Sequence, residues 1–180
     1  MIARVVLTRK CNRKCEGCSN DHPIFETHTK VGSINDVLAL NPTAIVLTGG
    51  EPMMRSQIVN TIRTMQAIAD KGISIVLYSA TYDPVLSESW VYAMSLLDGL
   101  SFTLHDGFND RDITGVIELT KLVKLYASNV DSRLNIDGRI SDEALSSCGD
   151  LSAWRKVRKL EWRDECTLPV GEQLFVVGGE

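Results

Sequence analysis

The sequence lacks the long apolar runs and the even set of cysteines that are typical of membrane and secreted proteins. No stretch approaches the roughly 20 apolar residues that a membrane-spanning helix requires. The apolar start of the chain, residues 1–11, is too short for a signal peptide. The five cysteines are an odd number, which argues against a disulfide framework. We therefore expect a cytoplasmic protein without membrane contact, in a reducing compartment that suits exposed thiolates.

The sequence also lacks an excess of positive charge. Its 19 Lys and Arg residues against 23 Asp and Glu residues give a formal net charge of −4, whereas nucleic-acid-binding proteins usually carry a basic excess. General nucleic-acid binding is therefore not expected. No internal repeat or low-complexity tract is visible. A chain of 180 residues that is 44% hydrophobic can form one well-buried core, so we expect residues 1–180 to form a single domain.

Three cysteines near the N-terminus, Cys11, Cys15 and Cys18, form a C-x₃-C-x₂-C array. Three thiolates can hold three irons of a cubane cluster, while a [4Fe–4S] cluster contains four irons. The fourth iron then receives no cysteine from this loop. A cluster that only carries electrons is normally closed by four cysteines, so the open position suggests chemistry at the cluster.

The array alone leaves other metal sites open. His22 follows Cys18 by four positions, so Cys11, Cys15, Cys18 and His22 could also form a tetrahedral Cys₃His zinc site, as in an interaction module. The other two cysteines are expected to be free thiols. These are Cys148, and Cys166, which follows the last predicted strand of the alternating pattern and could lie near a substrate.

Short apolar runs alternate with longer amphipathic stretches along the chain. The apolar runs predict strands at residues 2–7, 44–48, 73–79, 100–104, 133–136 and 158–162. The amphipathic stretches predict helices at residues 33–40, 56–70, 84–97, 112–127 and 142–147. A last apolar run, residues 173–177, is expected to pair at an edge of the sheet.

This alternation of strand and helix predicts an α/β protein with a parallel sheet built from βαβ units. At roughly 30 residues per unit the length suits six units, while a complete eight-unit barrel usually needs about 250 residues. We therefore expect a partial (β/α)₆ barrel or a curved open parallel sheet. Functional sites in such folds lie at the carboxyl ends of the strands. The cysteine array follows the first predicted strand and should lie at that end.

A second motif, Gly49-Gly50-Glu51-Pro52, directly follows the second predicted strand. Paired glycines allow the backbone to approach a ligand closely and to adopt positive φ. Pro52 restricts the preceding residues to extended geometry, which leaves Glu51 pointing into the site as a hydrogen-bond acceptor. The alternative is an ordinary strand-to-helix turn with a solvated glutamate.

Together the two motifs resemble the pattern of the radical S-adenosylmethionine (SAM) superfamily, as does the strand–helix layout over nearly the whole chain. The resemblance implies a [4Fe–4S] cluster on Cys11, Cys15 and Cys18, with SAM chelating the open iron through its methionine amine and carboxylate. It places Gly49, Gly50 and Glu51 around the methionine amino group. The implied activity is reductive cleavage of SAM to methionine and a 5′-deoxyadenosyl radical, which abstracts a hydrogen atom from the substrate.

The resemblance leaves the substrate open. Many members of the superfamily have an aromatic residue before the third cysteine, where this chain has Gly17. In that position the chain is similar to the activating enzymes of anaerobic ribonucleotide reductase, which implies activation of a glycyl-radical protein. The alternative is modification of a small molecule, as in the compact 7-carboxy-7-deazaguanine synthases. Either reaction implies a flavodoxin or ferredoxin-type reductant.

Polar residues at the predicted strand ends are further candidates. The superfamily places ribose and carboxylate contacts at such positions, which makes Ser79 and Asn135 the preferred cofactor contacts, with turn capping as the alternative. His105 titrates near neutrality in general and could act as an acid or base or orient the cofactor, or simply be a hydrogen-bonded strand-end histidine. Asp106 follows the fourth predicted strand and Asp137 follows the fifth.

Basic residues in this acidic chain have two interpretations. The segment 154–159 concentrates positive charge, and Arg13 and Lys14 lie beside the array. Such residues usually form a solvated face, but they could also dock an acidic reductant such as flavodoxin or a phosphorylated substrate. Arg133 is expected to be a surface strand arginine, with bidentate pairing to a carboxylate as the alternative.

Overall fold

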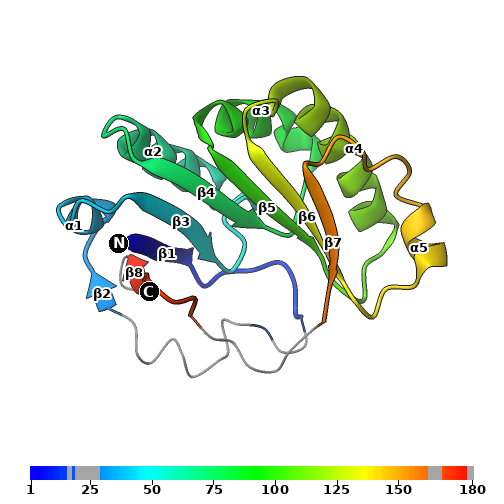
Figure 1. The fold of residues 1–180 in the computed structure, drawn as a ribbon, viewed down its shortest axis with the longest axis horizontal. Helices are drawn as coiled ribbons and strands as arrows, with labels where there is room; N and C mark the ends of the chain where they lie inside the picture. The colour runs from blue at the N-terminus through cyan, green and yellow to red at the C-terminus, as the bar shows by residue number, and fades with distance from the viewer. Residues whose placement is uncertain (16–17, 19–28, 162–167, 178–180) are drawn as a thin grey trace.

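The computed structural model describes residues 1–15, 18, 29–161 and 168–177. Its strands form one parallel sheet with the order β2-β8-β1-β3-β4-β5-β6-β7 (Figure 1). The strands are β1 (Ile2–Thr8), β2 (Thr29–Val31), β3 (Ala44–Gly49), β4 (Ser74–Ser79), β5 (Gly99–Leu104), β6 (Asp131–Asp137), β7 (Lys156–Leu160) and β8 (Glu172–Val177). Within the described residues, β2 and β7 are the two edges and do not pair with each other, so the sheet is open. The prediction of an α/β fold with a curved open parallel sheet is confirmed.

The six predicted strands of the alternating pattern are all present, but the last apolar run was placed wrongly. β8 lies between β1 and β2 and pairs with both, whereas residues 173–177 were expected at an edge. The edge strand on this side of the sheet is β2, which the sequence pattern did not predict. β2 has only three residues, Thr29-Lys30-Val31, and so short a segment carries no readable alternation.

The described residues form five α-helices between these strands, and Figure 1 shows α2, α3 and α4 on the same side of the sheet. The helices are α1 (Ile34–Leu38), α2 (Ile58–Ala69), α3 (Ser87–Leu96), α4 (Asp110–Tyr126) and α5 (Asp142–Ser146), with a short 3₁₀ helix, η3 (Pro84–Leu86), before α3. The residues of α2 and α4 that are buried recur at helical spacing, as the sequence pattern predicted.

The main core lies between the sheet and these helices. Trp90 of α3 is completely buried and stacks obliquely on Tyr82 and edge-on against Phe102 of β5. Apolar side chains from the strands and from α2 and α4 complete the same cluster, including Val5, Leu47, Leu77, Met65, Ile68, Val116 and Leu119. Burial of this apolar surface, at about 25 cal/mol per Å², is the main favourable term in forming the fold.

The other side of the sheet carries polar residues next to a small apolar cluster that includes Val6 and Leu174. Alternate residues of the central strands point away from the helices, because successive side chains of a strand point to opposite faces. On that side lie Arg4, Tyr78, Ser101, Arg133 and Asn135, and the sheet curves so that this face is concave (Figure 1). Both faces of a parallel sheet are usually covered by apolar layers, so the polar residues on the concave face mark a candidate functional surface.

Among the helices that the structure describes, none is both long and apolar enough to cross a membrane.

Candidate functional site

The two sequence motifs lie side by side at the carboxyl ends of β1 and β3, which are neighbouring parallel strands. The Gly50 amide donates to the carbonyl oxygen of Thr8 over 2.6 Å, and the Glu51 amide donates to that of Lys10 over 2.9 Å. The backbone pairing of the sheet therefore continues past the strand ends. It joins the glycine motif directly to the segment that leads into Cys11.

This contact explains the two glycines. Gly49 has a φ of +133°, and a Cβ atom on it would lie 2.3 Å from the carbonyl oxygen of Thr8. A Cβ on Gly50 would lie 2.0 Å from the carbonyl oxygen of Lys10. A side chain at either position would thus collide with backbone. The close backbone approach that the two glycines were predicted to make is therefore made to residues 8–10 of the same chain. Contact of Gly49 and Gly50 with a cofactor stays a prediction.

Glu51 is buried, with 1% of its surface exposed, which rules out the solvated turn glutamate. Its carboxylate accepts hydrogen bonds from the Ser79 hydroxyl at 2.7 Å, the Ala80 amide at 2.8 Å and the Met53 amide at 2.9 Å. Burial raises its pKa, although these three donors act in the opposite direction. Glu51 therefore ties the turn after β3 to the end of β4, and it brings the predicted cofactor residue Ser79 into the same site.

The three thiols of the cysteine array are free and at least partly accessible. Cys11 is exposed, and Cys15 and Cys18 are partly exposed. Burial raises the pKa of Cys11 and of Cys15, and the neighbouring thiols contribute in the same direction, so the three groups lie within electrostatic reach of one another. Mutual repulsion of three thiolates is relieved when a cation binds between them.

The donor set fits an iron–sulfur cluster by its chemistry, because it consists of three soft sulfur ligands on one loop, none in a disulfide. In the described part of the chain no three His, Cys, Asp or Glu side chains are gathered closely enough to hold a metal ion. Metal binding would therefore have to draw the three sulfurs together. His22, the fourth ligand of the zinc alternative, lies outside the described residues, as do Gly17 and Cys166.

Arg13 anchors the cysteine loop to α4. Its guanidinium forms a bidentate pair with Asp112, with Nη1 to Oδ1 at 2.6 Å and Nη2 to Oδ2 at 3.3 Å, and the two side chains are only 14% and 15% exposed. Asp112 also accepts a hydrogen bond from the Asn109 amide in the capping box of α4. The side chain of Arg13 is therefore neither part of a solvated face nor open to a docking partner. Both interpretations given for this residue in the sequence are corrected. Lys14 remains exposed.

A second side-chain contact, besides that of Arg13, holds the cysteine loop. The side-chain oxygen of Asn12 accepts from the Thr81 hydroxyl at 3.2 Å, which ties the loop to the segment after β4. These partners were missed in the sequence analysis. The capping pattern of Asn109 and Asp112 marks the start of a helix, but nothing in the sequence links that helix to Arg13.

His105 does not titrate near neutrality, contrary to the expectation. Burial lowers its pKa to about 4, and the positive charge of Arg13 acts in the same direction. His105 is therefore neutral at pH 7. Asp137 is buried and pairs with Arg139 at 2.8 Å, which lowers the pKa of this carboxyl to about 2. The exposed Asp106 donates its amide to Asp137 at 3.3 Å.

Asn135 lies inside β6 and on the concave face, with 4% of its surface exposed. Its Nδ2 donates to the Ser101 hydroxyl at 2.8 Å, and its Oδ1 accepts from Nε of Arg158 at 2.7 Å. A role of Asn135 in cofactor binding stays a prediction. Arg133 pairs with Asp131 of its own strand, and both side chains are over two-fifths exposed.

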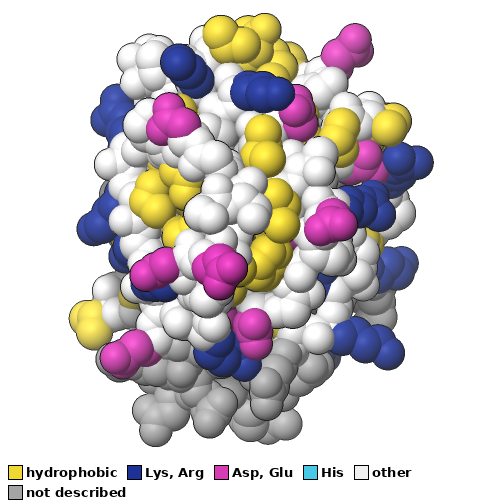
Figure 2. Space-filling model, turned by 90° about the vertical axis from the view of Figure 1, so that its right-hand side faces the viewer, with side chains coloured by type: hydrophobic (Ala, Val, Ile, Leu, Met, Phe, Trp, Pro, Cys, Tyr) yellow, Lys and Arg dark blue, Asp and Glu magenta, His cyan; other side chains and the backbone are white. Residues whose placement is uncertain are grey.

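The basic segment 154–159 does not form one patch. Trp154 is buried and donates to Thr120, Arg155 donates to the carbonyl oxygen of Ser128, and Lys159 pairs with Asp142. Figure 2 shows acidic and basic side chains scattered together over the face that forms the right-hand side of Figure 1. Cys148 is a buried free thiol whose pKa is raised by burial, as expected for a core cysteine.

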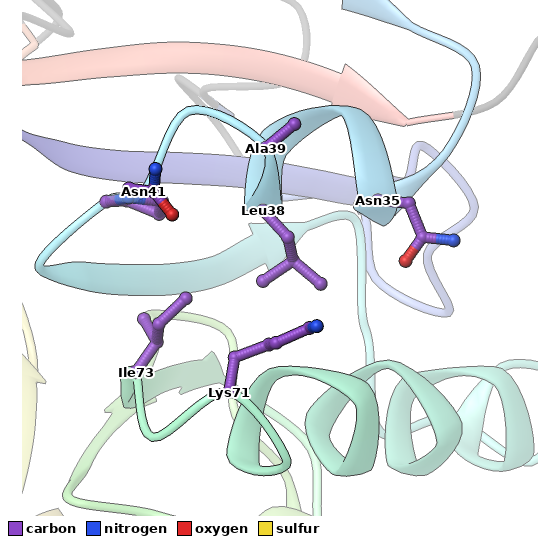
Figure 3. A pocket seen from close by; sticks show the side chains of 7 residues that line it. Asn35, Leu38, Ala39, Asn41, Lys71 and Ile73 are labelled. Atoms are coloured by element: carbon purple, nitrogen blue, oxygen red, sulfur yellow. The ribbon is translucent and has the colours of Figure 1, made fainter.

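Three cavities are lined by residues that the structure describes. One of about 530 Å³ lies between α1 and the turn from α2 to β4, where Leu38 points across the pocket toward Lys71 and Ile73 (Figure 3). It is at the amino ends of the strands, away from the cysteine loop. A second, of about 330 Å³, borders the cysteine loop at Asn12 and includes Arg55 and Arg111. A third, of about 320 Å³, lies on the concave face.

Comparison with known proteins identifies similar enzymes but no matching family model. A probable GTP 3′,8-cyclase of Saccharolobus islandicus (strain Y.N.15.51 / Yellowstone #2) is 26% identical over 139 residues, which cover 71% of this chain and 43% of that protein. The GTP 3′,8-cyclases of Clostridium perfringens strains SM101 and 13 (both Type A) are each 32% identical over 75 residues, which cover 37% of this chain and 23% of those proteins.

The chain thus spans less than half the length of the curated relatives it matches. GTP 3′,8-cyclases are radical SAM enzymes. At low identity, the comparisons therefore support the radical SAM superfamily for this chain.

Proposed function

We propose that this chain is a radical SAM enzyme in which Cys11, Cys15 and Cys18 hold a [4Fe–4S] cluster. The observation that carries the proposal is the backbone junction of the two motifs, in which Gly50 and Glu51 pair with Thr8 and Lys10 beside the cysteine loop. The three thiols lie at the carboxyl end of a parallel sheet, where ligands bind in α/β folds. The similarity to GTP 3′,8-cyclases supports the same superfamily.

The cluster ligands and the turn after β3 would have separate roles in binding and cleaving SAM. The bound cluster would supply one electron to SAM, which is cleaved to methionine and a 5′-deoxyadenosyl radical. Gly49 and Gly50 hold the β3 turn against the cysteine loop, and Glu51 fixes that turn to Ser79. The turn would line the methionine amino group of SAM, with Ser79, His105 and Asn135 as further contacts around the cofactor.

For the substrate, the comparisons favour a small molecule over a glycyl-radical protein. The curated relatives are named for a reaction of GTP, so GTP is the first compound to assay. Activation of a glycyl-radical protein rests on Gly17, which lies outside the described residues. It remains the second candidate.

A flavodoxin or ferredoxin-type protein is proposed as the electron donor, in the cytoplasm. Two features support docking of such a donor near the cysteine loop. Cys11 and Lys14 are exposed, and the neighbouring cavity is lined by Arg55 and Arg111. Both arginines contact Asp83 but keep most of their side chains exposed, so they can attract an acidic surface.

Metal content tests the ligand assignment. After anaerobic reconstitution, iron analysis with visible and Mössbauer spectroscopy should give about four irons per chain. Cys15→Ala should abolish the cluster, whereas Cys148→Ala, which removes a buried thiol of the main core, should retain it. Stoichiometric zinc in place of iron would favour the Cys₃His alternative with His22. An intact cluster in Cys15→Ala would show that the ligands are assigned wrongly.

A further inference from the structure

Arg13 lies between the first two cysteines of the array and contacts both of them. Its backbone amide donates to Sγ of Cys11 at 3.4 Å. Burial raises the pKa of the Cys15 thiol, and the charge of Arg13 and a hydrogen bond from its side chain oppose that rise. One residue therefore supplies N–H donors to two of the three sulfurs that are proposed to hold the cluster.

α4 fixes the guanidinium of Arg13 in this position. Two of its N–H groups donate to the two carboxylate oxygens of Asp112, and Asp112 is held in turn by the Asn109 amide in the capping box of α4. The side chains of Arg13 and Asp112 are 14% and 15% exposed. Because water has little access to this pair, its charges are screened less than those of a surface ion pair.

The charges of Arg13 and Asp112 do not cancel each other at Cys15. Burial is the largest cause of the raised pKa of this thiol, and the charge of Arg13 is the largest of the causes that oppose it. The negative charge of Asp112 raises the same pKa, but by less than the charge of Arg13 lowers it. The ion pair therefore acts on this thiol as a net positive charge.

The charge of Arg13 also reaches side chains that follow two other strands. His105 follows β5, and burial lowers its pKa to about 4, with the charge of Arg13 as the second cause. Glu51 follows β3, and burial raises its pKa, while the charge of Arg13 is among the causes that oppose the rise. Arg13 thus lies within electrostatic reach of the cysteine loop, the turn after β3 and the end of β5.

A fixed positive charge and N–H donors at the sulfurs change the redox properties of an iron–sulfur cluster. Reduction adds one negative charge to the cluster, so both features stabilise the reduced form and raise the reduction potential. A nearby negative charge, such as that of Asp112, acts in the opposite direction. Arg13 combines both features in one residue, whereas the charge of its exposed neighbour Lys14 is screened by solvent.

We propose that Arg13 raises the reduction potential of the cluster held by Cys11, Cys15 and Cys18, and that Asp112 limits this effect. The inference rests on the proposed function, because it requires the cluster to form. No bond forms or breaks at Arg13: the cluster gains one electron, and a flavodoxin or ferredoxin-type donor loses one. A higher potential makes this transfer less unfavourable, so Arg13 sets how strong a reductant the donor must be.

A redox titration tests this inference. The protein is reconstituted anaerobically and kept free of SAM, and the reduced cluster is followed by electron paramagnetic resonance at a series of fixed potentials. In Arg13→Gln the ratio of reduced to oxidised cluster at a given potential should fall about tenfold, which lowers the midpoint potential by about 59 mV for one electron. Arg13→Lys keeps the charge without the planar fork and should give an intermediate midpoint potential.

Asp112→Asn separates an electrostatic role of Arg13 from a merely structural one. Arg13→Gln and Asp112→Asn break the same ion pair, so a role in anchoring the loop alone predicts shifts in the same direction. The proposal predicts opposite directions, because Asp112→Asn removes a negative charge and should raise the ratio of reduced to oxidised cluster about fivefold. Lys14→Gln and Asp110→Asn make the same two charge changes at exposed residues, and as controls they should change the ratio by less than about twofold.

Iron content and melting temperature are measured first for every variant. Opposite shifts for Arg13→Gln and Asp112→Asn, with small shifts for the controls, support the inference. Unchanged midpoint potentials, or shifts of the same sign, overturn it. If Arg13→Gln takes up no cluster, a raised midpoint in Asp112→Asn supports the inference and a lowered or unchanged one overturns it. A wild type without a cluster overturns the proposed function, whereas a cluster with unshifted potentials overturns this inference alone.

Discussion

Asp137 shows how one buried carboxylate makes stability depend on pH. Its hydrogen bonds with Arg139 lower its pKa to about 2, below the ordinary value of 3.8. A carboxyl whose pKa is lower in the folded than in the unfolded state binds fewer protons when folded. Its stabilising contribution is therefore present above about pH 4 and is lost as the pH falls toward 2.

We expect Asp137→Asn to lower the free energy of unfolding by about 2 kcal/mol at pH 7. The difference from the wild type should narrow as the pH falls from about 4 toward 2, where the wild-type carboxyl becomes protonated. Urea unfolding followed by circular dichroism at a series of pH values measures it. A difference that stays constant with pH would mean that the ion pair with Arg139 does not stabilise the fold.

At the residue scale, local spacing was enough to choose candidate residues but not to predict their contacts. The three cysteines and Glu51 could be chosen from local spacing alone. The partner of Glu51 at Ser79 lies 28 positions away, and the partner of Arg13 at Asp112 lies 99 positions away. Such contacts depend on how strands and helices are brought together, so no local pattern contains them. The low pKa of His105 likewise follows from burial in the folded chain.

The turn between β3 and α2 is the element that joins the two motifs, and Gly50 tests it. A Cβ in Gly50→Ala would lie 2.0 Å from the Lys10 carbonyl oxygen, so the turn or the cysteine loop must move. We expect the free energy of unfolding to fall by about 3 kcal/mol. In the control Gly32→Ala, the nearest atom to the added Cβ is a side-chain oxygen of Asp36 at 3.4 Å, and the change should be within about 0.5 kcal/mol. Equal stabilities of the two variants would contradict the close contact.

The link between the cysteine loop and α4 gives a second test at this scale. Asp112→Asn retains an oxygen for the capping box but removes the charge that holds Arg13. We expect the loop to loosen and the rate of thiol alkylation at Cys15 to rise about fivefold or more in the reduced, metal-free protein, as expected for a loss of about 1 kcal/mol. Asp110→Asn, in the same turn of α4, makes the same charge change at an exposed residue and serves as the control. If both variants alkylate at the wild-type rate, Arg13 does not anchor the loop.

Elements were predicted well where their apolar patterns were long. α2 and α4 follow helical spacing, and the apolar run of β3 marks a buried strand. The pattern failed for β2, which is too short to alternate, and for the place of β8 in the sheet. Strand order depends on pairing between distant segments, and apolar runs alone do not define which strands become neighbours.

For the whole molecule, the open parallel sheet separates two environments. Its convex side carries the apolar core beneath α2, α3 and α4, and its concave side carries the polar network of Ser101, Asn135 and Arg158. The carboxyl ends of β1 and β3 place the cysteine loop beside the glycine motif. The concave side therefore carries polar and apolar residues together, with the free thiols at the carboxyl end of its strands.

The formation of 5′-deoxyadenosine tests the central claim most directly. The reconstituted protein is reduced with dithionite in the presence of SAM, and the product is measured by liquid chromatography and mass spectrometry. We expect the wild type and Cys148→Ala to form 5′-deoxyadenosine and Cys15→Ala to form none. A wild-type protein that contains about four irons per chain but forms no 5′-deoxyadenosine, or a Cys15→Ala variant that still forms it, would contradict the assignment of this site as a radical SAM centre.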